Sequence, residues 1–365
     1  MTLLLSLLLA CQADLAHDPS FAAASQDPAG TFALRVPGPM RVGEVMPLEV
    51  TVDAAQQIRI QAAVGSPGGR PGTDVWRAVP ADGVRDPSAY WEDFSAFTVN
   101  ARAGVARGES TTFQILLDQE VQITQPGRYA VQLETVRIED RALILPPVAF
   151  EVLPRDPAAD AKRLEEAKKA LETVKGADRL PHFHALRALG DTATLDAAIA
   201  AVQSETPDRE WVVVLHTHPD PDAVEKRLVE VVTSPTGVVT AEVLEALVAV
   251  RYDRAHPRAL DPEPSPAEVP QLKAFNVQRA ERRDSVKQLE AEAVGEVLAA
   301  LPGKTGSVSR TVEAVSKSGF ATADAPWRET WLAALRAHLH ETDPTFQALV
   351  LQNRWEVVSD PAAAE

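Results

Sequence analysis

The sequence predicts a multidomain β + α protein, with an antiparallel β-sandwich followed by an all-α domain of repeated helices. Two patterns predict this class. Apolar and polar residues alternate between residues 31 and 153, whereas apolar residues recur at helical spacing from residue 157 onward. A chain of 365 residues is also long enough to form more than one hydrophobic core. We therefore expect a sandwich over 31–153 and a helical domain over 157–356.

The composition is that of a folded protein with an acidic surface. Hydrophobic residues make up 45% of the chain and charged residues 24%, which is ordinary for a globular protein. The net charge of -16 argues against a nucleic-acid partner, because phosphate contacts need clustered Lys and Arg. The single cysteine, Cys11, excludes an intramolecular disulfide.

The chain opens with an apolar run, MTLLLSLLLA, that predicts a signal peptide over residues 1–10. This run is too short to span a bilayer as a helix, which takes roughly 20 apolar residues. Residues 8–11, Leu-Leu-Ala-Cys, resemble the lipobox of bacterial lipoproteins. The resemblance implies cleavage before Cys11 and acylation of that cysteine with chains such as palmitate. It also implies an outer-membrane or cell-surface location, because Gln12 stands where Asp would resemble an inner-membrane retention signal.

Residues 11–30 are small and polar, without apolar periodicity, and we expect them to form a flexible tether that begins at the lipidated Cys11. As a random coil, about 19 residues would average roughly 25 Å from end to end. We expect a short disordered tail over 357–365 at the other end of the chain.

The sandwich is predicted by half-buried strands, such as PLEVTV, TTFQILL and GRYAVQLETV, separated by Pro, Gly and Asp. In the last of these strands Tyr129, Val131 and Leu133 share one face, and Arg128, Gln132 and Glu134 share the other. About seven such strands resemble an immunoglobulin-like sandwich, here without the disulfide of antibody domains.

A long loop region, 65–109, interrupts the strands and contains clustered aromatic residues. If these aromatic side chains are exposed, they form a binding patch. The alternative, which we favour, is that they pack on the sandwich as its edge or as a satellite core. The residues in question are Tyr90, Trp91, Phe94 and Phe97.

After residue 157 the pattern is helical throughout. Several short amphipathic helices, and a longer charged one over about 271–301, resemble a HEAT- or armadillo-type solenoid. No clean repeat period accompanies them.

The stretch WVVVLHTHPDPDAV (211–224) admits two interpretations. A buried strand followed by metal ligands would resemble DHH-type phosphoesterases or the JAMM metalloproteases, with His216, His218, Asp220 and Asp222 as the ligands. Alternatively two helices meet at a turn, with Asp222 and Glu225 at capping-box spacing. We favour the turn, because the remaining residues of either family motif are missing and helical patterns lie on both sides.

The other histidine pairs, 182/184 and 338/340, lie in helical patterns, where residues two apart point away from each other. The run PGKTGS (302–307) lacks the first glycine of a phosphate-binding loop, and we give it no functional role. We therefore expect a lipid-anchored, non-enzymatic envelope protein, without a cofactor, that binds an envelope protein or polymer. The alternative is a metal-dependent hydrolase centred on residues 216–222.

Overall fold

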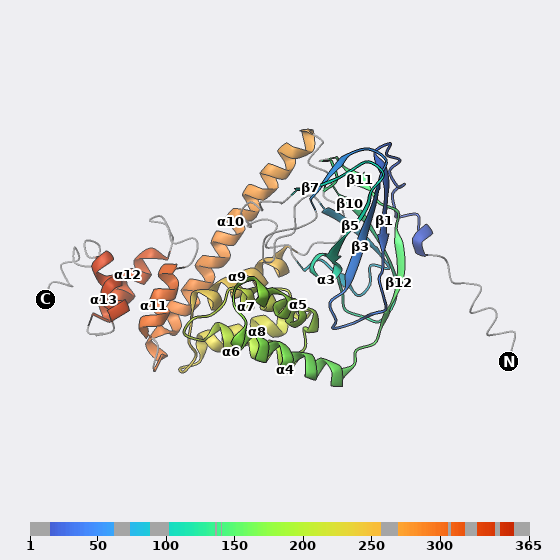
Figure 1. Ribbon diagram of the computed structural model, residues 1–365. Coiled ribbons are helices and arrows are strands. Elements are labelled where there is room, and N and C mark those ends of the chain that lie inside the picture. The colour runs from blue at the N-terminus through green and yellow to red at the C-terminus, as the bar shows by residue number, and fades with distance from the viewer. Residues whose placement is uncertain are drawn as a thin grey trace. The chain divides into compact units, whose positions relative to one another are not determined.

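The computed structural model divides the chain into two compact units, one formed by residues 1–189 and 258–276 and the other by 190–257 and 277–365 (Figure 1). The structure describes residues 15–61, 74–87, 102–135, 137–139, 141–256, 269–305, 308–317, 327–339 and 344–353. The coarse fold prediction is confirmed for these residues, because antiparallel sheets occupy the first part of the chain and helices the second.

The first unit contains two main sheets. One has the order β1 (Gly30–Arg35), β3 (Pro47–Ala54), β8 (Ser110–Leu116) and is antiparallel throughout. In the other, β10 (Gly127–Thr135) pairs along one edge with β5 (Asp74–Val79) and along its other edge with β11 (Leu143–Ile144) and β12 (Val148–Leu153). A short strand, β2 (Met40–Arg41), runs parallel to β12. The remaining elements are two short strand pairs and a one-turn helix: β4 (Ile58–Gln61) with β7 (Arg102–Val105), β6 (Val84–Arg85) with β9 (Gln122–Ile123), and α3 (Leu117–Glu120).

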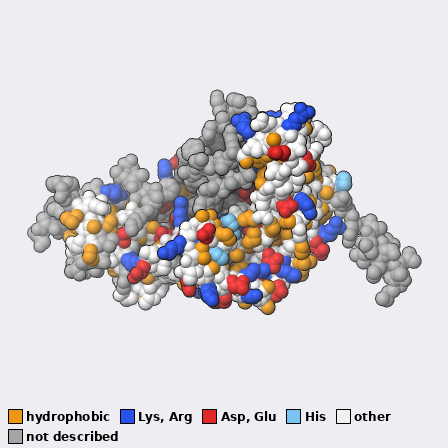
Figure 2. Space-filling view, viewed as in Figure 1, with side chains coloured by type: hydrophobic (Ala, Val, Ile, Leu, Met, Phe, Trp, Pro, Cys, Tyr) orange, Lys and Arg blue, Asp and Glu red, His pale blue; other side chains and the backbone are white. Residues whose placement is uncertain are grey.

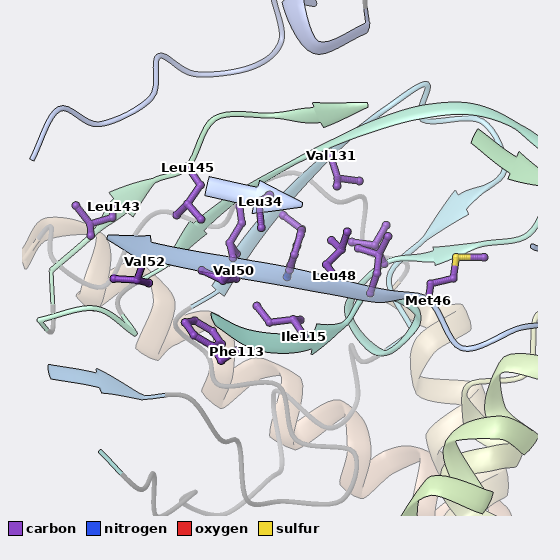
Figure 3. Packing of buried hydrophobic residues seen from close by; sticks show 14 of the residues in the cluster. Leu34, Met46, Leu48, Val50, Val52, Phe113, Ile115, Val131, Leu143 and Leu145 are labelled. Atoms are coloured by element: carbon purple, nitrogen blue, oxygen red, sulfur yellow. The ribbon is translucent and has the colours of Figure 1, made fainter. Parts of the chain in front are cut away.

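The strands alternate as the sequence predicts. In β3 the side chains of Leu48, Val50 and Val52 are fully buried, while the residues between them are partly exposed. These three residues join a single hydrophobic cluster to which both main sheets contribute, including Phe113 of β8 and Val131 of β10 (Figure 3). Burial of these alternate side chains fixes the register of the strands.

The outer face of β10 differs from the prediction, because Gln132 is buried rather than exposed. The Gln132 amide accepts a hydrogen bond from Ala22 N at 2.9 Å and donates one to Ala22 O at 2.7 Å. Farther along, Ser25 N donates to Ile144 O at 2.8 Å, and Ile144 N donates to Ser25 Oγ at 2.9 Å.

The flexible tether expected over 11–30 is therefore wrong for the residues that the structure describes. From η1 (Leu15–His17) to Gly30 the segment lies against the second sheet, and η1 packs on β10 and β12 (Figure 1). The physical reason is that small residues let the backbone approach the sheet closely enough for hydrogen bonds. Such contacts leave no apolar periodicity in the sequence.

Three helical elements also belong to the first unit, so the compact units divide at residues 189 and 190 rather than near 153–157. These elements are α4 (Pro157–Thr173), η2 (Gly176–Arg179) and α5 (Leu180–Leu189). Asp156 caps α4, accepting hydrogen bonds from two backbone N–H groups of its first turn. Arg163 of α4 forms an ion pair with Asp160 of the same helix and another with Glu44, which joins α4 to the turn before β3.

The described elements of regular structure in the second unit are all helices, joined by turns and short loops. Consecutive helices pack on one another, α6 on α7 and α8 on α9, and α7 also packs on α9. None of the described helices combines the length and apolar character that crossing a membrane requires. The helices are α6 (Thr192–Val202), α7 (Glu210–His216), α8 (Pro221–Thr233), α9 (Ala241–Ala255), α10 (Val269–Ala300, divided between the units after Asn276), η3 (Leu301–Gly303), α11 (Val308–Lys317), α12 (Arg328–Ala337) and α13 (Pro344–Gln352).

Candidate functional site

The histidine motif lies at a turn between two helices. The apolar residues that would have formed a strand belong to α7, which ends at His216, and α8 begins at Pro221. The apolar stripe predicted for α8 is confirmed, because Val224, Leu228 and Val232 are fully buried. The motif is therefore a helix–turn–helix junction inside the second unit, and the buried strand of the hydrolase alternative is wrong.

Asp220, rather than Asp222, caps α8. The Asp220 carboxylate accepts a hydrogen bond from Ala223 N at 2.9 Å, and Pro221 occupies the first helical position. Proline favours that position because its missing N–H would have no partner there. The N-cap thus lies two residues before Asp222, and the third helical residue is Ala223, which cannot complete a capping box. Asp222 instead lies 3.1 Å from Arg254 Nε of α9.

His218 links two helix N-termini. Its Nδ1 accepts a hydrogen bond from Asp220 N at 3.1 Å, and its Nε2 lies 3.3 Å from the carbonyl oxygen of Asp191, the N-cap of α6. Its Nδ1 also lies 3.3 Å from Asp220 O, so both ring nitrogens have backbone partners. The imidazole is 5% exposed, so its partners are protein groups rather than solvent.

His216 links α7 to α9. Its Nε2 lies 2.5 Å from Asp253 Oδ2, and the side chain of His216 is completely buried while that of Asp253 is 21% exposed. The pair therefore ties the last residue of α7 to the last turn of α9, and the carboxylate end of the pair is the end nearer to solvent.

The four candidate ligands do not form one site. His216 contacts α9, His218 bridges the starts of α6 and α8, Asp220 caps α8, and Asp222 pairs with Arg254. Among the described residues no three His, Cys, Asp or Glu side chains are grouped as metal ligands. Chemically, these side chains position helices.

A second polar centre, which the sequence did not predict, surrounds Lys304 in the run that resembles a phosphate loop. Its ammonium donates to the carbonyl oxygens of Val231, Ser234 and Gly237 at 2.9, 2.8 and 2.9 Å. Burial lowers the pKa of Lys304. Gly237 is required by this turn, because a Cβ there would lie 2.0 Å from Val231 O. The lysine ammonium therefore binds the carbonyl groups at the C-terminal end of α8 instead of a phosphate.

The first unit also buries charged groups. Arg137 and Asp74 form an ion pair at 2.5 Å with side chains 3% and 0% exposed, and Thr135 Oγ1 donates to the same carboxylate. Asp118 accepts from Met46 N at 2.8 Å, and burial raises its pKa. Burial, reinforced by the charge of Arg187, lowers the pKa of His184 to about 4.

One cleft among the described residues, of about 410 Å³, lies at one end of the sandwich and has Asp27, Asp53 and Glu109 in its walls. Its carboxylates already have partners. Asp27 lies 3.0 Å from Arg141 Nη1, and Asp53 accepts hydrogen bonds from the hydroxyls of Thr31 and Ser110. These contacts account for the acidic groups as parts of the sandwich.

Charges on the described surface are of both signs. Figure 2 shows acidic and basic side chains lying side by side on the face in view. Many form ion pairs between helices, such as Arg251 of α9 with Glu225 of α8 and Glu296 of α10. The binding residues proposed from sequence, Tyr90, Trp91, Phe94 and Phe97, lie outside the described residues, as does Cys11.

Comparison with known proteins gives no relative from which a function could be transferred. No protein-family model matches the chain, and no curated protein matches it.

Proposed function

We propose that this protein is a lipid-anchored component of a bacterial cell envelope, in which an immunoglobulin-like sandwich and a HEAT-like helical domain bind another envelope protein or a polymer. The observation that carries this proposal is the structural role of the side chains in the His216–Asp222 motif. Its histidines and aspartates hold helices together, so the most reactive-looking stretch of the chain has a structural role.

The strand pairing supports the immunoglobulin-like assignment. A three-stranded sheet, β1–β3–β8, and a sheet centred on β10 share one core, and the short β2 runs parallel to the final strand β12. Immunoglobulin-like sandwiches likewise pack two antiparallel sheets of three to five strands around one core.

The helix packing supports the HEAT-like assignment. Neighbouring helices from α6 to α9 pack pairwise, and both helices of a pair bury apolar side chains. Stacked helix pairs of this kind present extended surfaces on which proteins and polymers bind. A lipid on Cys11 would raise the local concentration of the helical surface at the membrane and so strengthen binding to an envelope partner.

Lipidation is tested by expressing the full chain in a bacterium with an outer membrane. We expect membrane fractions to contain a mature protein that begins at Cys11 and carries acyl chains, identified by mass spectrometry of its N-terminal peptide. A Cys11→Ser variant should lose the acyl mass and leave the membrane fraction. An unprocessed N-terminus on the wild-type protein would contradict the proposal.

Binding is tested by crosslinking in intact cells, followed by mass spectrometry of the linked peptides. We expect one partner linked repeatedly to peptides of α6–α9, with the same links reduced in Cys11→Ser cells.

Elemental analysis of the purified protein tests the alternative, a metal-dependent hydrolase. Stoichiometric zinc or manganese that is lost in His218→Ala would overturn the binding assignment.

A further inference from the structure

We propose that the sandwich sits directly against the membrane that holds the lipid, with the face covered by residues 15–29 turned toward the bilayer. This inference rests on the proposed lipidation of Cys11. It concerns an interaction surface, and the partner is the lipid headgroup layer of the protein's own membrane.

The first step is the fixed position of the segment. Gln132 holds Ala22 through both of its amide atoms, and Ser25 exchanges two hydrogen bonds with Ile144. The Gln132 side chain is fully buried and also donates to Leu145 O at 3.2 Å. A segment held by buried, paired hydrogen bonds is part of the sandwich and not a linker.

The second step is its direction. Ala22 is hydrogen-bonded to Gln132, and Ser25 is hydrogen-bonded to Ile144. Ile144 pairs with Glu134 across the sheet, so the segment runs in the same direction as β10. Farther back along the chain, η1 packs on β10 and β12. Because β12 pairs with residues 127–131 of β10, η1 lies toward the Gly127 end of that strand. The chain therefore leaves the sandwich at this position on the outer face of the sheet.

The third step is length. Only Gln12, Ala13 and Asp14 separate Cys11 from Leu15. Four chain steps, fully extended, span at most about 14 Å. A free linker from Cys11 to Gly30 would reach on the order of 65 Å when extended. The short chain from Cys11 keeps η1 near the acylated cysteine. The hydrogen bonds of Gln132 and Ser25, which we call the clamp, keep the sheet beside η1, so the sheet lies close to the lipid headgroups.

The experiment measures the distance between a fluorophore on the sandwich and acceptor dyes on lipid headgroups. The full-length lipidated protein is reconstituted into vesicles of phosphatidylethanolamine and phosphatidylglycerol. Because Cys11 is blocked by its lipid, a single introduced cysteine takes the label. One label replaces exposed Arg128 of β10, and the other replaces exposed Arg107, in the turn before β8 at the opposite end of the sandwich.

We expect the Arg128→Cys label to lie closer to the bilayer surface than the Arg107→Cys label. Insertion of 20 Gly/Ser residues between Asp14 and Leu15 should move the first label away by up to roughly 25 Å, the average extension of such a linker. Gln132→Leu, which removes the clamp, should also move it away and broaden the distance distribution. Gln114→Leu, at an exposed glutamine of β8, is the matched control and should leave the distance unchanged.

The outcomes separate the two proposals. Equal distances for both labels, or no response to the inserted linker, in protein whose acylation is verified by mass spectrometry would overturn the seating on the membrane and leave the anchor intact. An unacylated Cys11 would overturn both. If Gln132→Leu fails to fold, the linker insertion still decides, because it leaves the clamp unchanged.

Discussion

At the scale of single residues, the buried cation of Lys304 shows how one side chain holds several segments together. Its three acceptors come from the last turn of α8 and the loop after it, and Thr305 N adds a hydrogen bond to Pro235 O at 3.0 Å. A helix C-terminus leaves carbonyl groups without partners, and a cation there also complements the helix dipole. The residue is 8% exposed, so water is a poor substitute for the ammonium.

We predict that Lys304→Met lowers the free energy of unfolding by about 2–4 kcal/mol, because methionine fills the space but donates to none of the three carbonyls. Urea unfolding followed by circular dichroism measures this change. Lys287→Met is the control, since Lys287 lies on α10 with 65% of its side chain exposed, and it should change stability by less than about 0.5 kcal/mol. Equal effects of the two substitutions would show that the carbonyls do not depend on the ammonium.

His184 gives the first unit a pH dependence. Its pKa falls from 6.5 to about 4 on folding, first through burial and then through the charge of Arg187. The unfolded chain therefore binds the proton more tightly, and stability present above pH 6.5 is lost as the pH falls toward 4. Between pH 7.5 and pH 5.0 the loss is at most about 2 kcal/mol.

We predict that His184→Gln removes this part of the pH dependence, so that its stability differs less between pH 7.5 and pH 5.0 than that of the wild-type protein. Unfolding curves at the two pH values measure the difference. His182→Gln, two residues earlier on α5, is the matched control and should retain the wild-type dependence. The assignment fails if the two variants respond to pH in the same way.

At the scale of elements, the sequence predicts those that bury a regular stripe and misses those held by backbone contacts. The alternation of Leu48, Val50 and Val52 identifies β3, and the spacing of Val224, Leu228 and Val232 identifies α8. The sequence does not predict the position of the 15–29 segment, because its partners are carbonyl and amide groups of residues more than 100 positions away. The carbonyl groups around Lys304 are missed as well, because they lie 67 to 73 positions before it in the sequence.

The start of α8 shows a smaller error with a clear cause. Two aspartates flank Pro221, and the capping-box spacing favours the second. The choice depends on which residue precedes the first helical position, and proline occupies that position. Pro221 therefore identifies Asp220 as the N-cap, against the capping-box spacing of Asp222 and Glu225. In the structure Glu225 pairs with Arg251 instead of the helix start.

We predict that Asp220→Ala lowers the free energy of unfolding by about 1 kcal/mol, as loss of an N-cap usually does. Asp222→Ala should cost less, about 0.5 kcal/mol, because it removes only a surface ion pair with Arg254. Asp220→Asn should keep most of the wild-type stability, since asparagine also caps helices. Chemical denaturation of the three variants gives the order of their free energies of unfolding. A larger loss for Asp222→Ala than for Asp220→Ala would contradict Asp220 as the N-cap and favour the capping box at Asp222.

At the scale of the whole molecule, two compact units imply two cores that respond separately to damage. The first unit has the cluster between the sheets, with Trp76 and Leu133 fully buried in it. The second buries helix faces, including Phe346 of α13 and Trp331 of α12, whose indole donates to Val312 O at 3.0 Å. The change in periodicity at residue 157 identifies the helices correctly but places the division too early, because α4 and α5 pack with the sheets' unit.

Substitution of Arg137 tests this separation. Its guanidinium donates to Asp74 through Nε at 2.7 Å, and both side chains are buried in the first unit. Arg137→Met leaves the Asp74 carboxylate buried beside Thr135 alone, which should destabilise that unit by about 3–5 kcal/mol. Amide hydrogen exchange should therefore become faster in β5 and β10 and remain unchanged in α6 and α9. Arg35→Met, at an exposed position of β1, should leave both regions as in the wild-type protein. Equally faster exchange in α6 and α9 would mean that the chain opens as one cooperative body, and the division into two units would then have no energetic meaning.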